Sequence, residues 1–409
     1  MFHILFFWEG NVLLGKNKSV FGIMSVIQGL YWIIFCSVSG FATVYMLDRG
    51  INDGEVGTII AVACFISVFV QFGSGFIIEK IPKLTLKRMI VGSTCLMALI
   101  NILLMLFHES NLVIGTLYCI AVILLYNIQP LMTSLVYEYD NAGYHVSFSV
   151  TRGIGSGAYA LTSFLLGGWL AKHSSLTIPI VTILASLLLL SLLFALPKIE
   201  EVPKEMVVNK LDDSKSSNRL LKRYPSLLPL IIAIALVFTF HNLVNVFLPQ
   251  IISSVNGGQS QIGYAIAIAS AVEIPVMFGF QWLEKKFNVR NLLLISVVFF
   301  LIRSVLYLIA GSFTQIIPVQ LLQMFSFALI TPAYAHYINL IMDEKDNVKG
   351  QSFVMAALTF GNVVGSFVGG QIITHYGVKT MLAFGVVVMV LGVLSMFYSM
   401  KVDKNCRTQ

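Results

Sequence analysis

Long apolar stretches, separated by short polar or Gly- and Pro-containing segments, follow one another along most of this chain. A helix needs about 20 mostly apolar residues to cross a bilayer, and each of these stretches is roughly that long. We therefore predict membrane-spanning helices at 20–47, 55–78, 88–107, 111–136, 147–171, 177–196, 227–252, 260–283, 291–310, 315–341, 351–374 and 379–400. Twelve such helices indicate an all-α integral membrane protein.

One long polar segment interrupts this pattern in the middle of the chain. Residues 197–226 contain three prolines and seven Lys or Arg residues. We interpret this segment as a linker between two six-helix bundles, at 20–196 and 227–400. The N-terminal segment 1–19, to which we assign no function, and the tail 401–409 lie outside the bundles.

Lys and Arg residues between the predicted helices gather on one side of the membrane. Both ends of the chain, the linker and three loops on that side are basic, whereas the other side holds only Arg49, Lys172 and Lys379. Segments rich in Lys and Arg stay in the cytoplasm. We therefore predict a multi-pass protein of the inner or plasma membrane whose two termini and linker are cytoplasmic.

The composition agrees with a membrane protein and argues against several other classes. The chain is 57% hydrophobic and only 11% charged, unlike a soluble domain. Its formal net charge of +7 comes from short loops and not from one basic face, so we expect no nucleic-acid partner. The sequence has no metal-ligating cluster, no phosphate-binding Gly-rich loop and no nucleophile–base motif. We therefore predict no metal, no cofactor, no catalytic residue and no enzymatic activity.

The two predicted bundles repeat each other in sequence. The matching segments are 54–61 with 260–267, Glu79-Lys80 with Glu284-Lys285, and 164–168 with 366–370. The matches are in register at about half the chain length, as expected for an internal repeat. Two repeats of this kind place a substrate cavity between them near the middle of the membrane, with alternating access from the two sides.

Two charged residues lie deep inside consecutive predicted helices. Glu273 and Arg303 each stand alone in a long apolar run. In a helical hairpin both would lie roughly 16–20 Å from the connecting loop, near the middle of the bilayer. An unpaired charge at that depth costs several kcal/mol, so we expect these two residues to form an ion pair. The pair either carries a coupling proton or only holds the hairpin together.

The architecture and one motif resemble the major facilitator superfamily. The second predicted helix ends in Gly75-Phe-Ile-Ile-Glu79-Lys80, followed by further basic residues, which is similar to the signature of that superfamily. Glu79 stands where Asp is usual, and Pro82 stands where Gly is usual. The resemblance implies the major facilitator fold and a gating loop that contains Gly75, Glu79 and Lys80.

A closer resemblance is to the oligosaccharide:proton symporter branch, which includes lactose permease. It rests on Gln71 in the second predicted helix, Glu273 and Arg303 in the eighth and ninth, and Arg152 with Tyr159 in the fifth. The resemblance implies that Glu273 and Arg303 serve proton coupling and that Arg152 and Tyr159 bind substrate. A guanidinium fork and an aromatic face suit a polyhydroxylated ring.

Other positions depart from that branch. Charged residues of lactose permease fall near Thr133, on Gln323 and Ser326, and near His241 and Leu358. Lactose is therefore not the expected substrate. Glu273 is left as the buried carboxylate that can carry a proton, and His241 is the substitute; a packed hydrogen-bonding histidine is the structural alternative.

Further polar and aromatic residues inside the predicted helices are weaker candidates. The substrate-binding candidates among them are Gln28, Tyr31, Asn127, Asn242 and Gln323, and Trp32 is another residue that could line a cavity. Amide and aromatic groups suit sugars or nucleosides, but they suit helix packing equally well. For Arg152, the structural alternative is an ion pair with Glu138 or Asp140.

The sequence therefore predicts a secondary active transporter that imports a small sugar, glycoside or nucleoside with protons. We expect a monomer whose partners are a small polar organic substrate, protons and the lipid bilayer. A drug or metabolite exporter is the alternative, although the Pro-containing motif of such exporters is absent between Arg152 and Lys172. A receptor or scaffold would need a large extramembrane domain, and the linker is the longest extramembrane segment.

Overall fold

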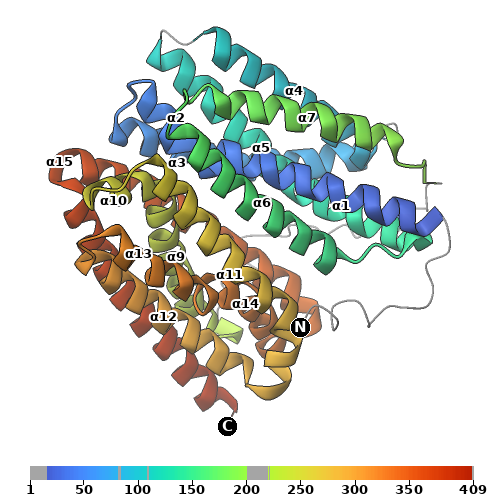
Figure 1. Ribbon diagram of the computed structural model, residues 1–409. Coiled ribbons are helices and arrows are strands. Elements are labelled where there is room, and N and C mark those ends of the chain that lie inside the picture. Colours follow the sequence, from blue (N-terminus) through green and yellow to red (C-terminus); the bar gives the residue numbers. More distant parts are fainter. Residues whose placement is uncertain (1–15, 82–83, 108–109, 200–219, 221, 408–409) are drawn as a thin grey trace, which may run out of the picture.

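The computed structural model describes residues 16–81, 84–107, 110–199, 220 and 222–407, nearly all of which are helical (Figure 1). The first half contains α1 (Lys16–Phe35), α2 (Ala42–Asp48), α3 (Asp53–Lys80), α4 (Leu86–Leu106), α5 (Asn111–Tyr139), α6 (Phe148–Leu170) and α7 (Thr177–Ala195). The second half contains α9 (Leu227–Val246), α10 (Leu248–Ser254), α11 (Gln259–Lys286), α12 (Val289–Ile309), α13 (Phe313–Leu321), α14 (Phe327–Ile341) and α15 (Glu344–Arg407).

The predicted fold class is confirmed, although fewer than twelve helical segments meet both the length and the apolarity expected of a membrane span. Ten helical segments of the described chain are both long and apolar enough to cross a membrane. α6 is also of spanning length, but its many Gly, Ser and Thr residues and Arg152 reduce its apolar character. α15 breaks at Gly377, where φ is 80°, and so covers two predicted spans. Counting α6 and both parts of α15 gives the twelve predicted spans.

Three of the spans consist of shorter helical pieces. A π-helical turn, Cys36–Gly40, joins α1 to α2, and a 3₁₀ turn, Leu322–Met324, joins α13 to α14. α9 and α10 meet at Phe247, where Pro249 at the start of α10 lacks an N–H for the preceding turn. Interrupted helices of this kind often form substrate and ion sites in membrane transporters.

Each half packs around its own apolar core. The first core is formed mainly by α1 to α7, and the second by α9 to α15. Leu248 and Ile252 of α10 and Ile262 of α11 belong to the first core, so the beginning of the second half packs against the first half. Figure 1 shows the two halves side by side, the first in blue to green and the second in yellow to red.

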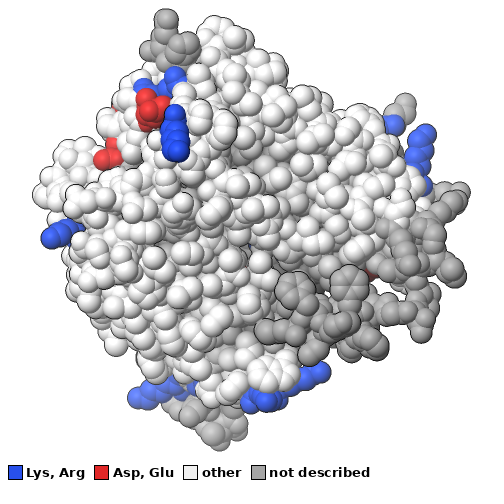
Figure 2. Space-filling model, in the orientation of Figure 1, with Lys and Arg blue, Asp and Glu red and all other residues white. Residues whose placement is uncertain are grey.

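Exposed charged side chains lie mainly near the ends of the helices. On the face drawn in Figure 2, coloured Lys, Arg, Asp and Glu atoms stand near the margins, and the middle of the face is uncharged. Large apolar side chains also point outward, as Leu184, Leu187 and Leu188 do on α7. An apolar surface of this extent suits contact with lipid.

The two halves approach each other most closely at glycines of the repeated segments. Gly57 of α3 lies against Gly370 of α15, and Gly167 of α6 lies against Gly263 of α11. At all four positions a Cβ atom would press against the opposing helix backbone. Helix backbones can come this close only where small residues face each other. The second span of each half thus packs against the other half's fifth, as expected for two repeats around an approximate two-fold axis.

Polar contacts join the halves at one end of the molecule. Gln250 Nε2 of α10 donates to Asp53 Oδ1 at the start of α3, at 2.6 Å. Thr43 Oγ1 of α2 donates to the carbonyl of Val246 at the end of α9, at 2.5 Å. Figure 1 shows α2 and α10 at the end opposite the beginning of α1 and the end of α15. In this conformation the halves are therefore joined at that opposite end.

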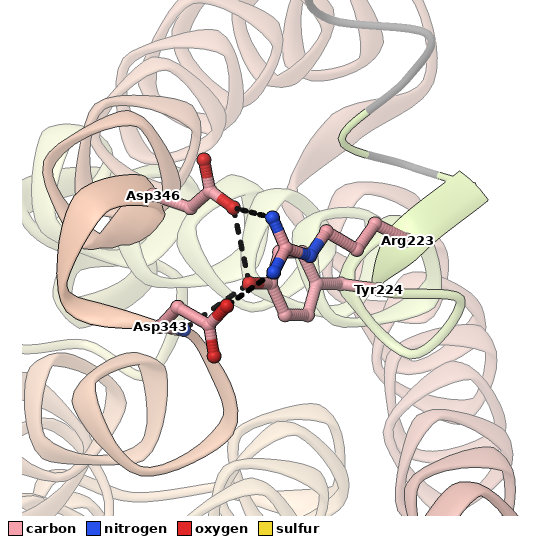
Figure 3. Close-up of polar contacts among 4 residues, drawn as sticks. All are labelled: Arg223, Tyr224, Asp343 and Asp346. Atoms are coloured by element: carbon pink, nitrogen blue, oxygen red, sulfur yellow. Dashed lines mark hydrogen bonds and ion pairs between the residues drawn. The ribbon is translucent and has the colours of Figure 1, made fainter.

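The end of the linker is held against the second half by a polar clamp (Figure 3). Arg223 contacts Asp343 through Nη2 and Asp346 through Nη1, the latter at 3.0 Å. Tyr224 Oη donates to Asp346 Oδ2 and accepts from the backbone N–H of Asp343, both at 3.1 Å. The clamp ties the segment before α9 to the connection between α14 and α15. The rest of the predicted linker, 200–219 and 221, lies outside the described residues.

Candidate functional site

The two buried charges of the second half belong to one hydrogen-bonded network. Glu273 of α11 is 8% exposed and Arg303 of α12 is 2% exposed. Gln323, in the 3₁₀ turn between α13 and α14, donates through Nε2 to Glu273 Oε1 at 2.8 Å. Arg303 donates to Gln323 Oε1 at 2.6 Å and to Ser326 Oγ at 2.9 Å. The break in the tenth predicted span therefore supplies the groups that connect the two charges.

This geometry corrects the ion pair expected from the sequence. Among the described residues, no direct ion pair joins Glu273 to Arg303, because the amide of Gln323 lies between them. The two charges still attract each other across that amide. The sequence identified the buried charges, but it gave Gln323 a role in substrate binding and not in connecting them.

His241 of α9 lies beside this network. Its ring stacks on Phe327 with the ring centres 4.1 Å apart, and its edge faces Phe300. Asn245 Nδ2 lies 2.8 Å from Nε2 of the histidine. An amide nitrogen can only donate, so Nε2 accepts and the ring is neutral in this arrangement. This geometry agrees with the structural alternative of a packed, hydrogen-bonding histidine.

In the first half, Arg152 is held by an aromatic ring and a hydroxyl. Its guanidinium lies over the ring of Trp32 of α1, 3.8 Å from the ring centre, and Nη1 donates to Ser156 Oγ at 2.6 Å. Trp32 is also in contact with Phe35 and, edge to face, with Tyr159. A cation stacked on an aromatic face is stabilised by about 0.5–2 kcal/mol. Arg152 is thus engaged inside the bundle, instead of pairing with Glu138 or Asp140.

The two sets of residues come together across the boundary between the halves. α6, which carries Arg152 and Tyr159, packs along α11, which carries Glu273. The charges of Arg152 and Glu273 interact across this boundary, although they form no ion pair within the described residues. An aromatic and guanidinium surface on one half therefore lies near a carboxylate and amide network on the other.

Comparison with known proteins identifies the family. The model of the MFS_1 like family matches residues 24–386, which is most of the chain. The chain belongs to this family. Membership makes the protein a multi-pass membrane transporter with the major facilitator fold. No curated protein matches the sequence.

Solved structures agree with this fold at low sequence identity. A mutant of the nucleoside transporter NupG is 15% identical, with a TM-score of 0.78, and the alignment covers 94% of this chain and 99% of that chain. A bacterial homologue of the human lysosomal transporter Spinster, inward-facing and unoccupied, is 14% identical, with a TM-score of 0.65 and coverage of 95% and 96%. An auto-inhibited peptide transporter of the POT family is 11% identical, with a TM-score of 0.70 and coverage of 94% and 97%.

Within this MFS_1-like protein, other predicted site residues make helix-to-helix contacts. Asn242 Nδ2 of α9 donates to Ser366 Oγ and to the carbonyl of Asn362 on α15. Asn127 of α5 accepts from Ser74 of α3 at 2.8 Å. The remaining candidates from α1 are buried: Tyr31, whose hydroxyl donates to the carbonyl of Leu125, and Gln28. These contacts explain structural roles, and substrate binding by these residues stays a prediction.

The gating-loop motif lies in the last turns of α3 and not in a loop. Gly75, Glu79 and Lys80 are helical, and α3 ends at Lys80. Gly75 lines a shallow hollow between α3, α4 and α5, and Lys80 Nζ lies 4.3 Å from the ring centre of Phe76. The side chain of Glu79 lies outside the described residues, and so do Pro82 and Lys83.

Only one of the two partners of Arg152 could be recognised from the sequence. Ser156 follows it by four residues, so their proximity on one helix face was predictable. Trp32 lies on another helix, and only the tertiary packing of α1 against α6 brings its ring to the guanidinium. The role of Gln323 as a bridge depends in the same way on three separate elements.

Proposed function

We propose that the protein imports a small sugar, glycoside or nucleoside together with protons by alternating access. The observation that carries this proposal is the juxtaposition of the Arg152–Trp32 stack with the Glu273–Gln323–Arg303 network across the boundary between the halves. Substrate binds between the halves, where both sets of residues reach it, and the halves rock about it.

The substrate class follows from the chemistry of the first-half residues. Arg152 offers several N–H donors in a fixed fork, and Trp32, Phe35 and Tyr159 provide adjoining aromatic faces. Hydroxyl groups accept from a guanidinium, and a sugar ring or nucleobase stacks on an aromatic ring. The resemblance of the fold to the nucleoside transporter NupG makes nucleosides the first class to test.

The buried carboxylate of Glu273 supports protons as the coupling ion. Of the described carboxylates, Glu273 and Asp403 are buried, and Asp403 lies near the end of α15, 4.0 Å from Arg290. Glu273 is therefore the candidate that can exchange a proton near the substrate. Its match to the acid of the oligosaccharide:proton symporter branch supports proton coupling, and the departures at Gln323 and His241 argue against lactose.

Uptake into vesicles with an imposed proton gradient tests the proposal. Labelled nucleosides, glycosides and sugars should be compared in the full-length protein, and at least one should accumulate above its external concentration when the outside is acidic. No accumulation of any of them, or extrusion of dyes instead, would favour the exporter.

A variant of Glu273 tests the coupling. Glu273→Gln keeps a neutral group of similar shape but cannot release a proton, so proton-driven accumulation should disappear while exchange of substrate continues. Normal accumulation in this variant would exclude Glu273 as the coupling group and turn attention to His241.

A further inference from the structure

Gln323 contacts both buried charges with opposite ends of one amide. Its side chain is 5% exposed, its Oε1 accepts from Arg303, and its Nε2 donates to Glu273. The three residues come from different elements: α11, α12 and the turn between α13 and α14. A single side chain therefore connects three separate parts of the second half.

The direction of this bridge is fixed by its partners. A guanidinium has only donors, and an ionised carboxylate has only acceptors. The amide oxygen must therefore face Arg303, and the amide nitrogen must face Glu273. A bridging side chain needs an acceptor and a donor on neighbouring atoms, and neither a carboxylate nor an apolar group at position 323 provides both.

We infer that Gln323 is a positioning residue that holds the carboxylate of Glu273 and the guanidinium of Arg303 in one unit without letting them pair directly. The consequence for coupling rests on the proposed proton-driven function. Within the described part of the second half, Glu273 is contacted by the neutral amide of Gln323 and by no direct ion-pair partner. Its attraction to Arg152 of the first half then contributes to holding the halves together.

Two positively charged groups act on Glu273. Arg303 approaches from α12 and Arg152 from α6. The Nε of Arg303 is buried without a hydrogen-bond partner in the described part of the chain. Arg303 thus depends on Gln323 and Ser326 for its acceptors, so losing the amide affects both charges together.

An exchange of the two side chains tests the bridge by thermal unfolding of the purified full-length protein. Q323E alone places two carboxylates side by side in the bundle and removes the donor to Glu273. The unfolding midpoint should fall by on the order of 5 °C or more. In the double variant E273Q/Q323E the introduced carboxylate accepts from Arg303 and the introduced amide donates to it. Most of the lost stability should therefore return.

Gln320 provides a matched control one turn away. It is 2% exposed and accepts from Tyr307 Oη at 2.8 Å, and none of the described residues is a charged hydrogen-bond partner of this amide. E273Q/Q320E should show no recovery, because a carboxylate there cannot complete the bridge. Q323H, which can accept at one ring nitrogen and donate at the other, should retain more stability than Q323L. Losses that simply add in E273Q/Q323E, or equal recovery in both double variants, would overturn the inference.

The transport readout separates this inference from the proposed function. Thermal unfolding needs no substrate, so recovery in E273Q/Q323E supports the bridge even if no candidate substrate is taken up. Where uptake is observed, the same variant should be stable but should lose proton-driven accumulation, because its carboxylate has moved away from Arg152. A stable variant with unchanged accumulation would show that the position of the carboxylate does not matter and would overturn the coupling role.

Discussion

At the scale of single residues, the stacking of Arg152 on Trp32 makes a prediction about substrate affinity. Arg152→Lys keeps the positive charge but loses the planar group that lies on the indole and the fork that reaches Ser156. We expect substrate binding to the purified variant to weaken by about 10-fold or more. Direct binding, measured by calorimetry on the purified variant, checks this.

Two comparisons make that test decisive. Ser156→Ala removes one hydrogen bond but leaves the stack, so it should weaken binding less than Arg152→Lys does. Membrane levels and unfolding midpoints of both variants should stay close to the original. An unchanged affinity in Arg152→Lys would remove this residue from the substrate site and leave it a packing role.

Some residues of the site could be recognised from the sequence alone, and others could not. Glu273, Arg303 and Arg152 were recognisable because a lone charge in an apolar run is costly and therefore informative. The function of Gln323 was not recognisable, because an amide in a membrane helix suits packing, bridging and substrate binding alike. Its partners lie 50 and 20 residues away in sequence, so its geometry depends on how three elements pack.

At the scale of helices, the contacts of Asn242 predict a role in stability. Its amide connects α9 to α15 through Ser366 and the carbonyl of Asn362. Asn242→Ala removes a buried donor and both of its hydrogen bonds to α15, so stability should fall by about 1–3 kcal/mol. If the role of Asn242 is purely structural, substrate affinity should not change. Ile232→Ala, at an exposed position on the same helix, is the control and should change stability by less than about 0.5 kcal/mol. Lower affinity with normal stability in Asn242→Ala would restore its predicted role in substrate binding.

Helix boundaries and helix breaks differ in how well the sequence predicts them. The start of α3 was predictable because Asn52 and Glu55 form a capping box at a polar boundary. The break between α13 and α14 was not, because Leu322, Gln323 and Met324 carry no helix-breaking signal of their own. The Arg303 contacts to Gln323 and Ser326 lie at that break, so tertiary hydrogen bonds accompany the local departure from an α-helix.

At the scale of the whole molecule, the close glycine contacts predict how the halves move. Gly57→Val would press a side chain against the backbone of α15 and so prevent α3 from closing on it. Cysteines placed at Asp53 and Gln250, whose side chains are hydrogen-bonded at 2.6 Å, should be joined by a short bifunctional thiol reagent in a cysteine-free background. Adding Gly57→Val should slow that cross-link several-fold. Gly73→Val, in the same helix but with open space at its Cβ, should leave the rate unchanged. Equal rates in all three proteins would mean that this contact does not limit closure.

The distribution of basic residues makes a last prediction, about the orientation of the whole molecule. α3 and α11 end in Lys80 and Lys286, on the side of the molecule where α1 begins and α15 ends, whereas Lys379 lies on the opposite side, after the break in α15 (Figure 1). Because basic segments are retained in the cytoplasm, the side with Lys80 and Lys286 should face inward. A single cysteine at Lys286 should react with an impermeant thiol reagent only after the cells are opened, and one at Lys379 should react in intact cells.

The same orientation makes the joined end, with α2 and α10, the outer one, so this conformation is closed to the outside. Labelling of Lys286→Cys in intact cells would mean that the molecule has the opposite orientation, with the joined end in the cytoplasm.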